Sequence, residues 1–272
     1  MKKIILLAGI VHAFSALYAQ NSLPFSGARA NGLANSTACL TDEWALFNNP
    51  AGLAKTRDLT AAFTQTLHPR LNAFNATAVA ATIPLKTGTA AAGFYHTGDD
   101  LYSEQIAAAG YANTFGLASL GASLHVIQYR AEGFGQTHKV TLSLGGITQL
   151  TPKLAVGAHI LNVNQPKLAD NGERIPTVMT AGLAYIFSDD VWATTEIQKD
   201  LDYHTTWRGA VEYKAHQKVS FRTGFSLNPG AAYLGIGLKP GKLGIDYAVS
   251  YIPETGTRHQ ASVRYSFKTA SK

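Results

Sequence analysis

The sequence of 272 residues has one cysteine, few charged residues and no long apolar run in its body. Cys39 has no partner in the chain, so intrachain disulfides cannot stabilise the fold. Charged residues make up only 15% of the chain, and no basic run or basic-aromatic interleaving indicates nucleic-acid binding. No segment beyond the amino terminus approaches the roughly 20 consecutive apolar residues that a spanning helix needs. Residence in the inner membrane is therefore not expected.

Motifs for catalysis and metal binding are also lacking. The nine histidines form no HExxH motif, no nucleophile elbow and no cluster with metal-ligand spacing. No glycine-rich phosphate loop follows a strand and opens a helix. We therefore expect no enzymatic activity, no cofactor and no metal, although a Ser–His pair could still assemble across strands.

The amino terminus has the features of an export signal. Lys2 and Lys3 precede an apolar run over residues 4–17, and Ala19 ends a stretch that suits cleavage. Residues 1–19 are therefore predicted to be a signal peptide. The residue directly after the cleavage site is Gln20 and not cysteine, which disfavours a lipoprotein anchor.

Most of the remaining chain alternates apolar and polar residues with a period of two. In residues 218–228, Val219, Phe221 and Phe225 share one face of a strand, while Ser220 and Arg222 lie on the other. A soluble β-sandwich shows the same alternation. The export signal, the lack of disulfides and the number of segments favour an all-β fold, a transmembrane antiparallel β-barrel with its apolar face toward lipid.

About fourteen strands are predicted, the even number that an antiparallel barrel requires if both of its chain termini are to face the periplasm. Their ranges are 59–67, 71–85, 89–97, 103–112, 117–130, 137–150, 154–164, 176–187, 191–199, 205–215, 218–228, 231–238, 243–252 and 257–267. The predicted organisation is a signal peptide (1–19), an amino-terminal plug or hatch segment (20–57), the barrel (58–268) and a carboxy-terminal tail (269–272).

The connections and the aromatic residues agree with this assignment. The predicted periplasmic turns are short and rich in turn formers, as at residues 86–88 and 151–153. The longest connection, residues 165–175, is expected on the extracellular side. Aromatic residues near strand ends, such as Tyr185 and Tyr265, fit girdles at the membrane interfaces. Ordinary aromatics of a soluble β core are the alternative. Because unpaired backbone groups are costly in hydrocarbon, the sheet must close on itself.

The segment between signal and barrel carries the sequence Asn48-Asn49-Pro50-Ala51-Gly52. Proline fixes its own φ and disfavours helix at the preceding residue, and asparagine side chains bond local backbone, so a compact knot is expected. An isolated Asn-Pro-Ala-Gly stretch is also common in ordinary turns. Its position here resembles the plug segment of the long-chain fatty-acid transporter (FadL-like) outer-membrane superfamily, and is most similar to the PorV/PorQ branch associated with type IX secretion.

The resemblance implies a fourteen-stranded barrel with its amino-terminal segment in the lumen as a plug. It also implies a Gram-negative outer-membrane protein, surrounded by lipid, that handles small molecules, hydrophobic ones among them. The alternative is a non-transporting accessory or scaffold of a type IX-like secretion system, in which the loops at 165–175 and 253–257 would contact partner proteins.

The inward faces of the late strands predict a charged lumen. We expect Arg208, Glu212, Arg222 and Arg264 to anchor the plug through residues such as Arg29, Asp42 and Glu43. A merely solvated lumen lining is the alternative.

A second hypothesis concerns a local gap between the second and third strands. Pro84, Gly88 and Gly93 lie there, and proline and glycine weaken strand pairing. An ordinary turn with ordinary neighbours is the alternative.

Overall fold

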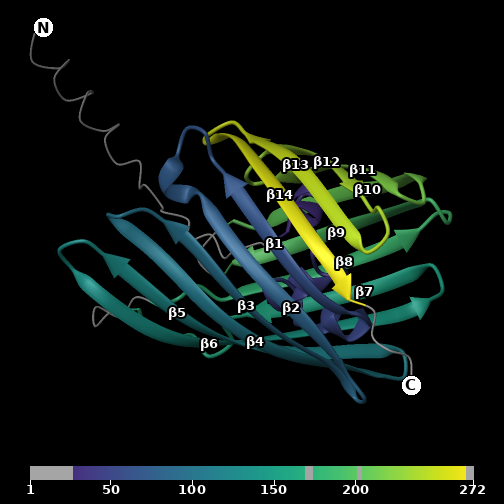
Figure 1. Ribbon diagram of the computed structural model, residues 1–272, viewed down its shortest axis with the longest axis horizontal. Helices are drawn as coiled ribbons and strands as arrows, with labels where there is room; N and C mark the ends of the chain where they lie inside the picture. Colours follow the sequence, from purple (N-terminus) through teal and green to yellow (C-terminus); the bar gives the residue numbers. More distant parts are fainter. Residues whose placement is uncertain (1–26, 169–173, 201–203, 268–272) are drawn as a thin grey trace, which may run out of the picture.

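The computed structural model describes residues 27–168, 174–200 and 204–267, so the predicted signal peptide and carboxy-terminal tail lie outside the described residues. Fourteen antiparallel strands form a closed barrel (Figure 1). Each strand pairs with its neighbours in sequence, and β1 (Leu59–Leu67) closes the sheet by pairing with β14 (Gly256–Phe267). The predicted closed fourteen-stranded barrel is confirmed.

The other strands follow in chain order and are joined mostly by short turns. They are β2 (Ala76–Leu85), β3 (Gly88–Gly98), β4 (Tyr102–Phe115), β5 (Ala118–Ala131), β6 (Gly135–Thr151), β7 (Leu154–Leu161), β8 (Val178–Ile186), β9 (Val191–Asp200), β10 (Thr206–His216), β11 (Val219–Leu227), β12 (Ala231–Leu238) and β13 (Leu243–Ile252).

Two predicted ranges differ from the structure. Residues 71–75 are not part of a strand, because a short 3-10 helix, η3 (Asn72–Phe74), precedes β2 and the Asn75 side chain accepts a hydrogen bond from the His68 N–H (2.7 Å). The predicted connection at 165–175 is longer in the structure, because β7 ends at Leu161 and β8 begins at Val178. Within this connection, Ile175 is 1% exposed and belongs to a buried apolar cluster. Leu168 packs against that cluster, which shields both side chains from water.

The two faces of the sheet differ in chemistry. Large apolar side chains point outward along every strand, and Phe63, Phe221 and Phe225 are each more than 40% exposed. Aromatic pairs such as Tyr185–Phe187 and Tyr265–Phe267 stand at strand ends, with ring centroids 4.9 and 4.8 Å apart. The outer face therefore has the composition of a lipid-facing barrel. No helix in the described ranges combines the length and apolar character needed to cross a membrane.

The predicted gap between β2 and β3 is wrong. The two strands pair continuously from Ala76–Thr97 to Leu85–Gly88, through Pro84 and Gly93. The missing side chain of Gly93 serves another purpose, because a Cβ there would lie 2.9 Å from the side chains of Leu46 and Phe47. Gly93 thus makes room for a segment inside the barrel.

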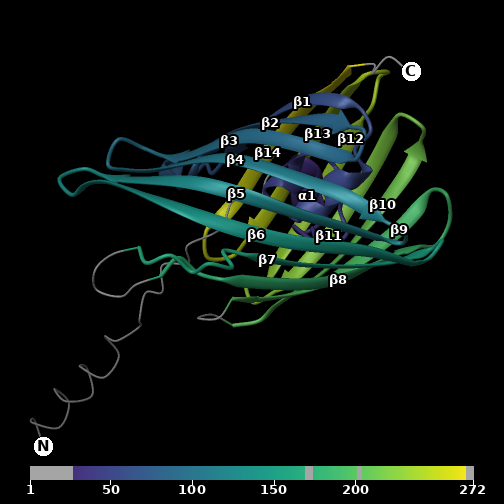
Figure 2. The ribbon, with the colours of Figure 1, turned by 90° about the horizontal axis from the view of Figure 1, so that it is seen from below.

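That segment, residues 27–58, is called here the inner segment. It contains α1 (Ala28–Gly32) and two 3-10 helices, η1 (Glu43–Leu46) and η2 (Pro50–Lys55). Figure 2 shows α1 enclosed by the strands. The α1 helix contacts β12, β13 and β14, whereas η2 contacts β4, β5 and β6 on the other side of the barrel. The inner segment thus reaches across the lumen.

Candidate functional site

The turn that carries the Asn-Pro-Ala sequence caps η2. Asn49 is extended (φ −96°, ψ 106°), as expected for the residue before a proline, and its side-chain Oδ1 accepts a hydrogen bond from the Ala51 N–H (3.1 Å). The Asn49 Nδ2 donates to the carbonyl oxygen of Ala38, 2.6 Å away. All five predicted motif residues, Asn48 to Gly52, are buried inside the barrel. The motif therefore ties two parts of the inner segment together.

One sector of the inner wall, over β1–β4, carries a buried cluster of small apolar residues. Ala62, Ala78, Ala91 and Ala108 belong to the same buried cluster as the segment's bulky side chains. Those bulky side chains are Trp44, Leu46, Phe47 and Leu53. Small wall residues leave room for large segment residues, so burial of these side chains from water stabilises the segment in place.

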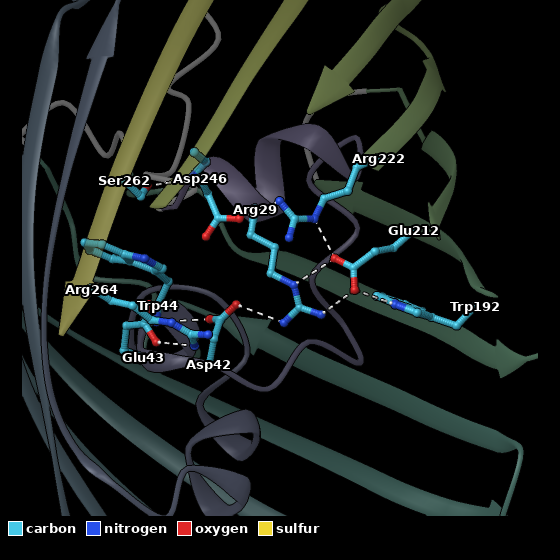
Figure 3. A network of polar contacts seen from close by, with 11 residues as sticks. Arg29, Asp42, Glu43, Trp44, Trp192, Glu212, Arg222, Asp246, Ser262 and Arg264 are labelled. Carbon is cyan, nitrogen blue, oxygen red and sulfur yellow. Dashed lines mark hydrogen bonds and ion pairs between the residues drawn. The ribbon is translucent and has the colours of Figure 1, made fainter. Parts of the chain in front are cut away.

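The opposite sector, over β9–β14, is charged and holds the segment by polar contacts (Figure 3). The Arg29 guanidinium donates to both carboxylate oxygens of Glu212 at 3.2 Å. Glu212 also accepts hydrogen bonds from Arg222 and from the Trp192 indole N–H (2.8 Å). One carboxylate thus joins the segment to three barrel strands.

Other contacts extend this network to β14. The Glu43 carboxylate forms an ion pair with Arg264 (3.6 Å), and the Ala28 N–H donates to the Ser262 hydroxyl (2.7 Å). Arg258 donates to the Asn31 side-chain oxygen at 2.7 Å. Charge-assisted hydrogen bonds of this kind are stronger than neutral ones.

The four residues predicted as anchors play two different parts. Glu212 and Arg264 contact the inner segment directly. Arg222 binds Glu212 and also Asp246 (2.6 Å). Arg208 binds Glu196 (2.8 Å), whose other oxygen accepts a hydrogen bond from the Ala38 N–H (2.7 Å). Arg208 and Arg222 therefore position carboxylates that hold the segment.

Sequence reasoning did not assign anchoring roles to Glu196, Ser262, Arg258 or Trp192. Glu196 and Ser262 were recognisable as inward-facing residues from the strand alternation. Nothing in the sequence indicates that they meet Ala38 and Ala28, because those contacts join residues 158 and 234 positions apart.

Burial shifts the ionisation of the segment's charged groups. Burial, together with the neighbouring Asp42 carboxylate, raises the pKa of Glu43 from 4.5 to about 7, although Arg264 opposes the shift. Burial raises the pKa of Asp42 as well, against the effect of Arg29. For Arg29, burial lowers the pKa, but the carboxylates of Glu212 and Asp42 outweigh it and hold the pKa above its ordinary value.

Glycines on the inner wall let the segment approach the strand backbone. A Cβ added to Gly121 would collide with the backbone of Pro50, and one added to Gly157 would collide with the carbonyl of Ala38. The same holds across the barrel, where Gly32 of the segment faces Gly235 of β12. Backbone therefore packs against backbone where the segment crosses the lumen.

A third sector, over β5–β8, is lined by hydroxyl groups and histidine. Ser123 pairs with Ser143 across β5 and β6, and His159 of β7 pairs with Thr180 of β8. Together with Thr141, these side chains are buried and have polar atoms without a hydrogen-bond partner among the described residues. They are called here the hydroxyl row.

Two cavities lie where the segment meets the wall near the short turns. One of about 240 Å³ is lined by the charged network, including Asp42, Glu43 and Arg264. Another of about 480 Å³ is lined by Cys39, Leu40 and Trp192 together with four cations, Arg29, Lys55, Lys153 and Lys214. Among the described residues, no group of three or more His, Cys, Asp or Glu side chains could hold a metal ion.

Solved structures share this architecture. The chain is similar to the toluene transporter TbuX of Ralstonia pickettii (TM-score 0.71, 12% identity), covering 91% of this chain and 100% of that one. It is also similar to CymD, a monoaromatic hydrocarbon channel, with a TM-score of 0.72 and 14% identity, and the match covers 92% of this chain and 100% of that one. A FadL homologue of Pseudomonas aeruginosa is similar with a TM-score of 0.61 and 13% identity, and the match covers 90% of this chain and 99% of that one. No protein-family model matches the sequence, and no curated protein matches it. At these identities the likeness establishes the fold.

Proposed function

We propose that this protein is an outer-membrane channel of the FadL-like superfamily that lets small molecules, hydrophobic ones among them, cross the membrane passively. The observation that carries the proposal is a closed barrel with an apolar outer face and an inner segment bound across its lumen. Structures with this fold include a toluene transporter and a monoaromatic hydrocarbon channel, which supports transport.

The inner segment acts as a plug in this proposal. Its apolar residues pack on β1–β4 and its charged residues bind β9–β14, so the segment resists displacement from both sides. A segment held this way keeps the barrel closed to large solutes while local movement opens a narrow path. Arg208, Glu212, Arg222 and Arg264 are proposed to set how readily that movement occurs.

An uptake assay tests the proposal. Cells that lack other hydrocarbon channels should take up radiolabelled toluene several times faster when they produce this protein than when they carry the empty vector. Membrane fractionation should place the protein in the outer membrane, and a heat-dependent shift on gels should show that the barrel is folded. Folded protein in the outer membrane without any gain in uptake would contradict the proposal.

The accessory role in type IX-like secretion and the PorV/PorQ branch remain predictions from the resemblance. Transport is preferred because TbuX and CymD are a transporter and a channel. Crosslinking in the native host followed by mass spectrometry would separate the two roles, since a scaffold should be recovered with secretion proteins. Absence of enzymatic activity also remains a prediction.

A further inference from the structure

The inner segment is bound unequally to the two sides of the barrel. Toward β9–β14 its contacts include hydrogen bonds of 2.7 Å from Ala28 and Ala38 and the ion pair between Arg29 and Glu212. Toward β5–β8, the Asn49 amide lies 3.4 and 3.5 Å from wall carbonyls, and the Leu46 carbonyl lies 3.4 Å from His125. The hydrogen bonds on the second side are longer and involve no charged group, so polar contacts oppose separation less there, although the segment packs closely on the wall glycines.

The wall on this side carries the hydroxyl row. Ser123, Ser143, His159 and Thr180 are each at most 4% exposed, and Thr141 is fully buried. Their hydroxyl oxygens and both ring nitrogens of His159 have no hydrogen-bond partner among the residues described. Leaving such groups buried and unpaired is unfavourable, so anything that pairs with them is favoured when the segment moves away.

The row extends over four strands and is interrupted at Gly145, against which the Asn49 side chain packs. Ser123 of β5 pairs with Ser143 of β6, and Gly145, two residues further along β6, pairs with His159 of β7, which in turn pairs with Thr180. Serine and threonine hydroxyls both donate and accept, and a neutral imidazole does the same through its two nitrogens. The row carries no fixed charge, so it suits uncharged partners better than ions.

We propose that solutes pass between the inner segment and the β5–β8 wall, and that the hydroxyl row selects small uncharged molecules bearing hydroxyl or similar hydrogen-bonding groups. This inference rests on the proposed channel function and names a solute class for it. The segment stays attached to β9–β14 through Glu212 and Arg264 while the opposite side opens. Ser36 and Thr37 of the segment, whose hydroxyls are also unpartnered among the described residues, precede the Ala38 that packs on Gly157 and Gly182 of this wall.

Liposome swelling with erythritol tests the solute class. The wild-type protein should speed swelling over protein-free liposomes, and a triple variant with Thr141→Val, Ser143→Ala and Thr180→Val should slow it about tenfold. The variant should fold, because it removes buried hydroxyls that lack partners. The matched control carries Thr66→Val, Ser103→Ala and Thr194→Val, buried residues outside β5–β8, and should swell at the wild-type rate.

A disulfide tests the location of the path. The Cys39 sulfur lies 3.8 Å from the Ala155 carbonyl oxygen on β7, so Ala155→Cys places a second thiol beside the only native one. Oxidation should tie the segment to the β5–β8 wall and stop erythritol swelling, and dithiothreitol should restore it. The same substitution combined with Cys39→Ser cannot form the disulfide and should stay active under both conditions.

The outcomes separate this inference from the channel proposal. Erythritol swelling at the wild-type rate in both the triple variant and the oxidised disulfide variant would overturn the inference. Toluene uptake without erythritol swelling would also overturn it and leave the channel proposal intact. If the folded protein passes neither toluene nor erythritol, the channel proposal itself fails.

Discussion

The Arg29 guanidinium and the Glu212 carboxylate meet at 3.2 Å although 183 residues separate them in the sequence. Glu212 is 3% exposed and also binds Arg222, so a single carboxylate balances two arginines. Figure 3 shows it between the segment and the strands. Removing one member of such a buried group leaves the others unpaired, which is strongly unfavourable.

Glu212→Gln should therefore loosen the inner segment. The loss of the negative charge removes the carboxylate that the two arginines share and leaves Arg29 only the more distant Asp42 (3.8 Å) as a counter-ion, at a cost of about 3–5 kcal/mol. Trypsin should then cleave after Arg29 in the folded barrel, which mass spectrometry of the fragments would show. Glu254→Gln, in the exposed turn between β13 and β14, is the control and should leave the segment resistant. Equal resistance in both variants would rule out an anchoring role for Glu212.

The closed position of the segment should weaken as the pH rises. Because burial raises the pKa of Glu43 from 4.5 to about 7, the folded segment holds this proton more tightly than the released segment does. The resulting stabilisation is complete below about pH 4.5 and is lost as the pH rises through about 7. Asp42, whose pKa burial also raises, acts in the same direction, while Arg264 limits the effect.

Amide hydrogen exchange of residues 43–47 measures this effect. After correction for intrinsic rates, local opening should be easier at about pH 8 than at about pH 5 by on the order of 2–3 kcal/mol. Glu43→Gln, which mimics the protonated side chain, should remove most of the difference. Stronger protection at the higher pH would show that the pair with Arg264 outweighs burial.

The thiol of Cys39 should react slowly. Burial, aided by the Glu196 carboxylate, raises the pKa of Cys39 from 9.0 to about 12, so its thiolate fraction near pH 8 falls about a thousandfold. Iodoacetamide labelling of the folded barrel should be slower by up to that factor than labelling of the same chain unfolded in guanidinium. Rates within about threefold of each other would mean that the thiol is neither buried nor perturbed.

Replacement by alanine should affect the stability of the barrel differently at two glycines that are close in space. Gly121→Ala brings a methyl group into the Pro50 backbone, whereas the Cβ of Gly146→Ala lies 3.6 Å from its nearest neighbour, on the outer face of β6. Gly121→Ala should destabilise the folded barrel by about 1–3 kcal/mol, and Gly146→Ala should leave its stability nearly unchanged. Urea unfolding in lipid vesicles would compare them. Equal stabilities would mean that the segment does not pack against β5.

The outer face is tested by one substitution made at two places. Phe63 lies in the middle of β1 and is 45% exposed, and Phe134 lies in the turn between β5 and β6 and is 93% exposed. Phe63→Lys should destabilise the vesicle-inserted barrel by about 2–4 kcal/mol, because it places a charge among acyl chains. Phe134→Lys should have little effect in water. A harmless Phe63→Lys would argue against insertion of this face in lipid.

Strands were predictable wherever the two faces of the sheet differ. Residues 231–238 and 243–252 match β12 and β13 because apolar outward residues alternate there with small or polar inward ones. β1–β4 offer less contrast, since inward residues such as Ala78 and Ala91 are themselves apolar and pack on the segment. The start of β2 was misplaced for a related reason, because the turn around Asn72 and Asn75 depends on side-chain hydrogen bonds that periodicity does not encode.

The sequence by itself determined the strands, their facing and the inward position of Arg208, Glu212, Arg222 and Arg264. These depend on residues two apart and on turns of a few residues, so local stereochemistry suffices. Only the tertiary structure decided which inward groups meet the segment, that Glu196 binds Ala38 and that the hydroxyl row lies on the wall where the segment's hydrogen bonds are longer. Those contacts depend on the closure of the sheet and on where the segment crosses the lumen, and both bring together residues more than a hundred positions apart.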